Sequence, residues 1–365
     1  MKSDPPEFPV NSDQLHASPW KVIATAKHFI GDGGTFRGID QGDTRLDLAT
    51  MLELHGRGYE SAIDEGVQTV MASFNSWNRD KIHGNHKLLT YVLKEQLGFD
   101  GFVIGDWNGH GQVEGCSNDS CPQAINAGID MLMAPEDWKA LIKNTIEQVR
   151  SGLISDVRID DAVRRILRVK FRAGIFERGL PSSRDGAGRD DVIGLRQHRE
   201  IARESVRKSL VLLKNNNATL PIKVARKILV AGDGANNIPK QTGGWTLTWQ
   251  GNENTNEDFP NATSIYAGLK RAIEATGGSV ELAEKDQWEN KPDVAIVIFG
   301  ENPYAEGTGD LEHLAFKDPY TANAALLSKL QAEDIPVVSV FLTGRPLFLN
   351  HMINQSDAFV VAWLP

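Results

Sequence analysis

Short apolar runs alternate with amphipathic stretches along the first half of the chain. The runs have the length and composition of buried strands, and the stretches between them repeat apolar residues at the helical period. We predict strands over residues 22–30, 67–74, 101–106 and 128–134. We predict helices over residues 48–65, 85–97, 136–150 and 160–171. Because strands that alternate with helices imply a parallel sheet with crossover helices, this half corresponds to four of the eight βα units of a (β/α)8 barrel.

A second alternation follows a polar stretch that is rich in Pro, Gly, Ser and Arg. On this composition we interpret residues 178–198 as a linker between a first domain over 1–177 and a second over 199–365. The second domain opens with a predicted helix over 201–213, in which 210–213 form a buried ridge. Its predicted strands are 227–231, 279–283, 294–299, 337–342 and 358–363. The pattern predicts an α/β sandwich that is incomplete at its C-terminal end, because the chain stops directly after a strand.

Length and charge narrow the class of protein. At about 150 residues for a typical domain, a chain of 365 residues is expected to form two domains, each with its own core. The net charge of −9 and the lack of a basic stripe argue against nucleic acid and anionic membrane surfaces as partners. No apolar stretch reaches the ~18 residues that a membrane span needs. A neutral substrate, such as a sugar, is compatible with this charge.

Two cysteines, Cys116 and Cys121, lie close together in a polar loop. A local disulfide would favour an oxidising compartment, whereas two free thiols would carry no such preference, and both alternatives stay open. One cysteine pair without a nearby histidine falls short of the four ligands of a structural metal site, so we predict no metal. Residues 1–19 are polar and contain proline, and they lack the apolar core of a signal peptide.

The first candidate cluster is a strand end followed by glycines. Lys27 and His28 close the first predicted strand, and residues 31–35 read Gly-Asp-Gly-Gly-Thr. A phosphate cradle is disfavoured, because neither Gly-Lys-Ser/Thr nor G-x-G-x-x-G spacing is present. At the mouth of a barrel, Lys and His side chains can donate hydrogen bonds to sugar hydroxyls. The alternative is a buried, hydrogen-bonded His beside a Lys that reaches solvent.

The second cluster is a carboxylate that ends the apolar run 101–106. Asp106 and the aromatic Trp107 would lie at the active-site end of a barrel strand. A Trp face suits stacking on a sugar, so the pair suggests carbohydrate chemistry. The alternative role of Asp106 is a cap or an ion-pair partner. In the preceding segment we predict Asn85 as a helix cap, and Trp77 either as packing or as a ligand contact.

Two loops of the second domain carry further carboxylates and aromatic rings. One loop holds Glu301 and Glu306, and an earlier one holds Trp245 and Trp249. Together with Asp106 they give two separated carboxylates flanked by tryptophans. A glycosidase needs that set, because one carboxylate acts as nucleophile and another protonates the leaving oxygen. The alternative for the acidic loop is an ordinary solvated turn.

In this order, the clusters resemble glycoside hydrolase family 3, and most of all its exo-β-glucan glucohydrolase and β-glucosidase branch. The resemblance rests on residues 27–35, 101–107, 243–251 and 300–310, and it extends over nearly the whole chain. It implies the C-terminal half of a (β/α)8 catalytic barrel, followed by the incomplete α/β sandwich. It implies no cofactor.

The resemblance also implies a role for each motif residue. Asp106 is the implied nucleophile and Glu306 the implied general acid/base, with Glu301 as the alternative acid. The implied substrate contacts are Lys27, His28, Phe74, Trp107, Trp245, Trp249 and Glu301. The implied reaction is the retaining hydrolysis of terminal non-reducing β-D-glucosyl residues from β-glucans and β-glucosides. A β-xyloside or α-arabinoside is the alternative substrate, and a non-catalytic sugar-binding remnant is the alternative function.

Several positions depart from the family's pattern. Phe74 stands where the family carries Tyr near the nucleophile, which would remove one hydrogen bond to Asp106. Gln41 and Gln112 stand where this branch can carry Glu and Arg. Residues 40–43 lack the Asp-x-His pair of the N-acetylglucosaminidase branch, so that branch is disfavoured.

Length is the largest departure. Family members carry the first half of the barrel ahead of the strand that ends at Lys27 and His28. We therefore predict that the chain is a fragment truncated at both ends. Its chemistry would then belong to a parent enzyme that is periplasmic or secreted. The sequence does not predict an oligomeric state.

Overall fold

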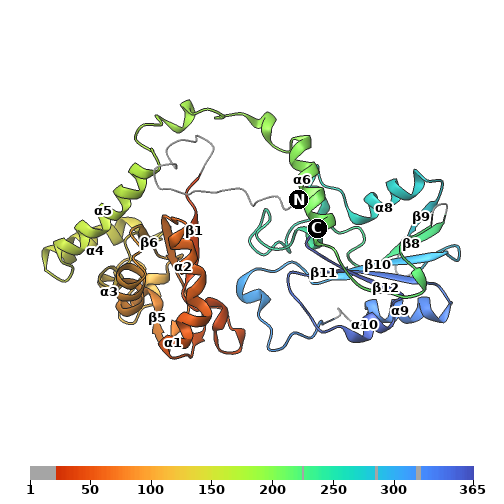
Figure 1. Ribbon diagram of the computed structural model, residues 1–365, viewed down its shortest axis with the longest axis horizontal. Coiled ribbons are helices and arrows are strands. Elements are labelled where there is room, and N and C mark those ends of the chain that lie inside the picture. The colour runs from red at the N-terminus through yellow and green to blue at the C-terminus, as the bar shows by residue number, and fades with distance from the viewer. Residues whose placement is uncertain (1–21, 224–225, 284–286, 318–321) are drawn as a thin grey trace, which may run out of the picture. The chain divides into compact units, whose positions relative to one another are not determined.

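The computed structural model of the chain describes residues 22–223, 226–283, 287–317 and 322–365. The chain divides into two compact units, Met1–Arg189 (unit 1) and Asp190–Pro365 (unit 2), and this division falls inside the stretch 178–198. Figure 1 shows the two units. Each has its own sheet and its own buried core. The predicted lack of a signal peptide concerns residues 1–19, which lie outside the described ranges.

Unit 1 is built around a short parallel sheet in the order β1-β3-β6. Its strands are β1 (Thr25–Phe29), β3 (Thr69–Ala72) and β6 (Phe102–Ile104), each inside a predicted strand. Thr25 pairs with Thr69, which in turn pairs with Phe102, so the three carboxyl ends lie at one edge of the sheet. The buried core takes apolar side chains from every strand: Phe29, Val70, Ala72 and Val103.

The predicted fourth strand over 128–134 is wrong in extent. Only Met131 pairs with β6, as an isolated parallel bridge. The backbone N–H groups of Asp130 and Met131 both donate to the carbonyl of Val103, so a regular ladder does not develop. Helix α3 (Pro122–Ala127), directly before this segment, is also missing from the predicted elements.

Helical segments occur where the amphipathic pattern predicts them. The first runs through α1 (Leu48–Met51), a π-helical turn (Leu52–Gly56) and α2 (Arg57–Asp64). The others are a π-helix (Lys87–Gln96), α4 (Trp138–Arg150) and α5 (Asp156–Arg172). Ser155 caps α5, because its side chain accepts a hydrogen bond from the N–H of Arg158. Short 3-10 turns lie at Asp32–Gly34, Phe36–Gly38, Ile82–Gly84, Gly109–Gln112 and Pro181–Ser183.

A second, three-stranded sheet in unit 1 is not predicted by the pattern. It joins β2 (Asp43–Thr44), β4 (Ser76–Trp77) and β5 (Asp80–Lys81) in the order β2-β4-β5. Strands of two residues are too short to show a period. The sheet fixes Trp77, whose indole N–H donates to the carbonyl of Leu46 at 2.8 Å, which favours packing over a ligand contact.

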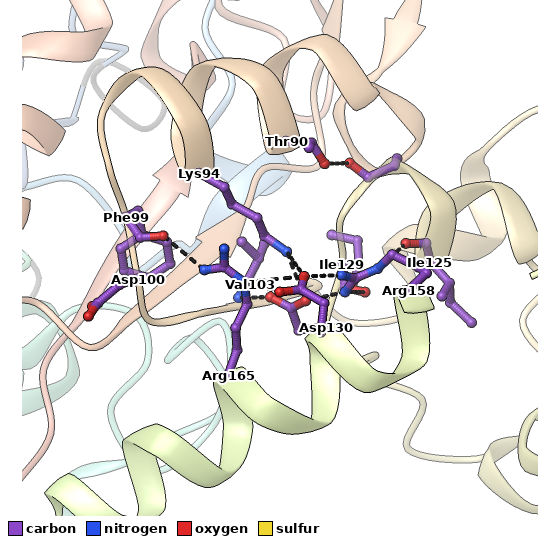
Figure 2. A network of polar contacts seen from close by, with 12 residues as sticks. Thr90, Lys94, Phe99, Asp100, Val103, Ile125, Ile129, Asp130, Arg158 and Arg165 are labelled. Atoms are coloured by element: carbon purple, nitrogen blue, oxygen red, sulfur yellow. Dashed lines mark hydrogen bonds and ion pairs between the residues drawn. The ribbon is translucent and has the colours of Figure 1, made fainter. Parts of the chain in front are cut away.

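A buried ion network ties α5 to the amino-terminal part of β6 (Figure 2). The carboxylate of Asp130 is fully buried and accepts from Lys94 Nζ and from the N–H of Val103, both at 2.8 Å. Arg158 pairs with the same carboxylate, and Arg165 donates to two backbone carbonyls just before β6, each at 2.9 Å. Burial lowers the pKa of Lys94 to about 8, and the charge of Asp130 opposes this shift. These contacts hold one end of β6 in place.

Unit 2 contains one six-stranded sheet in the order β7-β12-β11-β10-β8-β9. All neighbours are parallel except β7, which runs antiparallel to β12 at one edge. The strands are β7 (Val211–Asn215), β8 (Lys227–Ala231), β9 (Ser279–Leu282), β10 (Val294–Gly300), β11 (Val337–Leu342) and β12 (Ala358–Trp363). The five predicted strands of this half are confirmed. Every residue of β10 is buried, as expected for a strand covered on both faces.

Helices lie on both faces of this sheet. In Figure 1, α8 (Ile265–Glu274) lies on one side, and α9 (Ala322–Ala332) and α10 (Asn350–Asn354) lie on the other. The arrangement agrees with the predicted open α/β sandwich. The other helical segments are α6 (Arg196–Ser209), α7 (Ile238–Thr242) and 3-10 turns at Asp190–Val192, Asn216–Ala218, Asn256–Asp258 and Glu306–Gly309.

The predicted helix over 201–213 is wrong in its last turn. Helix α6 ends at Ser209, where Leu210 turns to extended backbone at φ −59° and ψ 134°. The following residues form β7, and Leu212 is 54% exposed rather than part of a buried ridge. The run is apolar enough for either structure, and the open edge of β12 offers it a ladder of backbone hydrogen bonds.

The order of the strands places a switch point between β8 and β10. From β8 the chain continues to β9 on one side, whereas from β10 it continues to β11 on the other. In open sheets of this kind, a crevice forms at the carboxyl ends of the two strands, and ligand-binding loops lie there. The chain just after β8 lies very close to β10, since a Cβ added at Gly232 would lie 2.2 Å from the carbonyl oxygen of Ile298.

Candidate active site

Asp106 lies just beyond the carboxyl end of β6, as predicted for a strand-end carboxylate. One carboxylate oxygen accepts from the N–H of Trp107 at 2.7 Å. The backbone N–H of Asp106 donates to Nε2 of His83 at 2.9 Å. The carboxyl group is 16% exposed, and the ring of Trp107 beside it is 55% exposed. The arrangement presents a fixed carboxylate next to an open aromatic face.

His28 lies between two carboxylates at the same end of the sheet. Its Nδ1 is 3.1 Å from Oδ2 of Asp32, and its Nε2 is 3.7 Å from Oδ2 of Asp106. The side chain of Lys27 is exposed. The structure therefore brings His28, Asp106 and Trp107 to one edge of unit 1, where parallel strands end.

His83 also contacts this edge, although the sequence predicts no role for it. It is fully buried, and Nε2 accepts a hydrogen bond, so a neutral ring with its proton on Nδ1 is required. Burial lowers the pKa of His83 to about 3, and the nearby His110 adds to the shift. Gly109 makes room for the ring, because a Cβ there would lie 2.5 Å from it. Phe74 flanks His83 with ring centroids 6.1 Å apart.

The two cysteines form a disulfide between Cys116 and Cys121, which settles the alternative of free thiols. The loop that this bond closes also holds Asn118, whose carbonyl oxygen lies 2.7 Å from Nε2 of His110. The disulfide loop therefore contacts His110, which lies near His83 and lowers the pKa of His83.

Three further sequence predictions concern neighbours of this edge. Asn85 acts as a cap, because its Oδ1 accepts from the N–H of Leu88 at 2.9 Å. Gln41 and Gln112, the two departures from the family's pattern, contact each other: Nε2 of Gln112 donates to Oε1 of Gln41 at 2.9 Å. A neutral amide pair therefore occupies these two positions.

In unit 2, Trp245 and Trp249 stand on the loop between α7 and the turn at Asn256–Asp258. Both rings are largely exposed, at 69% and 55%, and their centroids lie 6.1 Å apart at an interplanar angle of 48°. The N–H of Trp245 donates to the carbonyl of Trp249 at 2.8 Å, which closes the loop on itself. Exposed, preordered rings of this kind suit contact with a sugar face.

Glu301 and Glu306 differ sharply in their surroundings. Oε1 of Glu301 accepts two hydrogen bonds from Arg345, and its Oε2 accepts from the hydroxyl of Thr343 at 2.7 Å. Glu301 is thus held as an ion-pair partner. Glu306 is exposed and begins the turn Glu306–Gly309 with φ +47°, in the left-handed region. Of the two, Glu306 is the carboxylate presented to solvent.

The loop of the tryptophans and the acidic loop are joined within unit 2. Oε1 of Gln250 accepts from the N–H of Ala305 at 2.8 Å. Gly244 lies so close to the other loop that an added Cβ would be 2.1 Å from the carbonyl oxygen of Tyr304. The structure therefore brings Trp245, Trp249, Glu301 and Glu306 into one group of loops at the switch point.

Metal-binding clusters and membrane spans are both absent from the described ranges. Those ranges hold no group of three or more His, Cys, Asp or Glu side chains that could bind a metal ion. No helix in the same part of the chain is long and apolar enough to cross a bilayer.

Comparison with known protein families assigns both halves of the chain. The model of the Glycosyl hydrolase family 3 N terminal domain matches residues 12–169, and that of the family 3 C-terminal domain matches residues 210–365. The chain belongs to glycosyl hydrolase family 3.

Curated relatives match nearly the whole chain. A lysosomal beta glucosidase of Dictyostelium discoideum is 30% identical, over 94% of this chain and 44% of the relative. A beta-xylosidase of Formosa agariphila is 28% identical, over 94% of this chain and 50% of the relative. A periplasmic beta-glucosidase of Salmonella typhimurium is 26% identical, over 95% of this chain and 49% of the relative. The chain thus spans about half the length of these relatives.

A solved structure is more similar still. The exo-1,3/1,4-beta-glucanase of a Pseudoalteromonas species is 56% identical in sequence, with a TM-score of 0.91. The match covers 94% of this chain and 43% of that one.

Proposed function

We propose that the protein removes terminal, non-reducing β-D-glucosyl residues from β-glucans and β-glucosides with retention of configuration. One observation carries the proposal. In a family 3 chain that is 56% identical to an exo-1,3/1,4-beta-glucanase, the strand-end Asp106 is a fixed carboxylate beside His28 and the exposed Trp107. A glycosidase nucleophile needs such a position, because it must attack the anomeric carbon from a defined direction.

The proposed reaction has two steps that share one acid. Asp106 attacks the anomeric carbon while the bond to the aglycone oxygen breaks, and Glu306 gives its proton to that oxygen. The product of this step is a glucosyl ester of Asp106. Glu306 then takes a proton from water, which attacks the same carbon and releases glucose with the original configuration.

The remaining site residues contribute binding. Lys27 and His28 would donate hydrogen bonds to hydroxyls of the terminal glucose. Trp107 would stack on a sugar ring from unit 1, and Trp245 and Trp249 would supply aromatic faces from unit 2. Phe74 is proposed as a further substrate contact in unit 1. For Glu301 the bonds to Arg345 and Thr343 favour a supporting role over direct substrate contact.

The architecture and location of the proposed enzyme follow the same evidence of similarity. We assign residues 1–177 to part of a (β/α)8 barrel, 178–198 to a linker and 199–365 to the sandwich domain; the parallel order β1-β3-β6 supports the first assignment. The disulfide and the relatives named lysosomal and periplasmic support a location of the enzyme outside the cytosol.

A panel of aryl glycosides tests the proposal on the protein at its full natural length. We expect 4-nitrophenyl β-D-glucoside to have the highest kcat/KM, and β-anomeric glucose to be the first product seen by NMR. The relative named beta-xylosidase gives the alternative substrate a basis, so the β-D-xyloside belongs in the panel. Faster turnover of the xyloside would overturn the sugar assignment. An α-anomeric first product would overturn the retaining mechanism.

A further inference from the structure

We propose that Arg345 and Gln250 position the acid/base by fixing both ends of the turn that carries Glu306. The inference rests on the proposed function, since it takes Glu306 as the acid. It adds two positioning residues that act through Glu306 and need no contact with substrate.

Arg345 joins the beginning of the acidic loop to the end of its turn. Its Nε and Nη2 donate to Oε1 of Glu301 at 3.1 and 2.8 Å, where the chain leaves β10. Its Nη1 donates to the carbonyl of Gly309 at 2.5 Å, where the turn Glu306–Gly309 ends. Such a planar fork with several donors can hold two separate chain positions at once.

Tyr304 fills the space between these two attachment points. The guanidinium of Arg345 lies 4.4 Å from the centre of the Tyr304 ring. The ring also lies against Gly309, where an added Cβ would be only 2.4 Å from it. The phenol oxygen lies 3.4 Å from Oε2 of Glu301. The Tyr304 ring therefore packs against both attachment points of the loop, Glu301 and Gly309, and against Arg345.

Gln250 holds the other side of the turn. Its side-chain oxygen accepts the N–H of Ala305, the residue directly before Glu306, at 2.8 Å. Glu306 itself has φ +47°, which a residue with a side chain adopts only when its surroundings impose it. Anchors at residues 305 and 309 supply that constraint, so they set the direction of the Glu306 side chain.

A positioning role can be separated from a merely structural one by the leaving group. Protonation of the aglycone matters most when the leaving alcohol is a weak acid, and it matters little when the alcohol is acidic. A variant that displaces Glu306 must therefore lose activity unevenly across aryl glucosides. A variant that only loosens unit 2 loses activity to the same extent on all of them.

The test compares Arg345→Gln with Arg226→Gln in the full-length protein. Arg226 is a half-buried arginine directly before β8, and it contacts Asp293 at 4.0 Å at the amino-terminal ends of the strands, opposite to Arg345. For R345Q we expect kcat/KM on phenyl β-glucoside to fall about 100-fold, because a misplacement of a catalytic group by about 1 Å costs a factor of this size. On 2,4-dinitrophenyl β-glucoside the loss should be less than about threefold, because this leaving group needs little protonation. R345K should recover part of the loss, and R226Q should match the wild type.

Equal losses on both substrates, or no loss, would overturn the proposal. Hydrogen exchange at the Ala305 amide decides the matter independently of catalysis: it should accelerate in R345Q and in Gln250→Leu but not in R226Q. Unchanged exchange in both variants would show that Arg345 and Gln250 do not fix the turn. If the wild-type protein hydrolyses no glucoside, the proposed function is wrong. The hydrogen-exchange rates then still show whether Arg345 and Gln250 hold the turn in place.

Discussion

The two proposed catalytic carboxylates are held in different ways. Asp106 lies two residues beyond the end of β6, and its N–H donates to His83, a fully buried and neutral ring. Glu306 lies in an exposed turn beyond β10, and the contacts that fix this turn come from Gln250 and Arg345 on other loops. A fully buried ring thus supports one carboxylate, and part-buried hydrogen bonds from side chains of other loops support the other.

The difference matches what each group has to do. A nucleophile must keep one position and stay ionised, and the end of a strand gives it both a fixed backbone and polar neighbours. A general acid must reach leaving groups of different size, and a loop on a rigid scaffold can adapt while its ends stay fixed. Mutations of the two carboxylates are therefore expected to lower activity in different ways.

Removal of the nucleophile should have the largest effect. Asp106→Ala is expected to lower kcat on every aryl glucoside by at least about 10⁴-fold, because the variant lacks the carboxylate that forms the glucosyl ester. The loss should be similar for good and poor leaving groups. Circular dichroism should show the wild-type fold. A loss of less than about tenfold would exclude Asp106 as the nucleophile.

Removal of the acid should give a smaller and uneven effect. For Glu306→Ala we expect a loss of about 10²–10⁴-fold in kcat/KM on phenyl β-glucoside and much less on 2,4-dinitrophenyl β-glucoside. Azide should restore turnover, since it attacks the ester without a base and yields β-glucosyl azide. Glu301→Gln serves as the matched comparison. Azide rescue in that variant instead would move the acid role to Glu301.

The buried network of unit 1 should matter for stability rather than for chemistry. Asp130→Asn removes the fully buried partner of Lys94 and Arg158 and leaves them with the more exposed Asp161. The free energy of unfolding should therefore fall by about 3–5 kcal/mol. Urea denaturation measures the change. The exposed pair of Glu53 with Arg57 is the control, and Glu53→Gln should cost less than about 1 kcal/mol. Equal effects would show that the network does not anchor β6.

His83 should make stability depend on pH. Its pKa is about 3 in the folded chain and about 6.5 when unfolded, so between these values only the unfolded chain binds the proton. This contribution to stability is complete above about pH 6.5 and is lost as the pH falls, by roughly 1.4 kcal/mol per unit. In His83→Gln the stability difference between pH 7 and pH 5 should shrink by about 2 kcal/mol. An unchanged difference in urea denaturation would contradict the low pKa.

The sequence predicts most of the sheets because their strands are apolar runs of ordinary length. Residues 227–231, 337–342 and 358–363 match β8, β11 and β12 residue for residue. The failures have local causes. Residues 210–213 suit a helix or a strand equally, and only the open edge of β12 decides between them. Residues 128–134 are apolar enough for a strand, yet a single bridge forms.

The candidate site was predictable only where a motif carries it. Asp106, Trp107 and Glu306 stand in recognisable loops, whereas the roles of His83 and Arg345 depend on contacts with distant positions. Arg345 meets Glu301 from 44 residues away in the chain, and His83 meets Asp106 from 23 residues away. No local pattern contains such information, because it arises from the packing of separate strands and loops.

Trapping of the covalent intermediate tests the role of Asp106 most directly. The protein would be incubated with a 2-deoxy-2-fluoro-β-D-glucoside that carries a good leaving group, digested and sequenced by mass spectrometry. We expect one fluoroglucosyl group, bound as an ester to Asp106. A label on any other residue, or turnover through a single inverting step with no ester, would contradict this assignment.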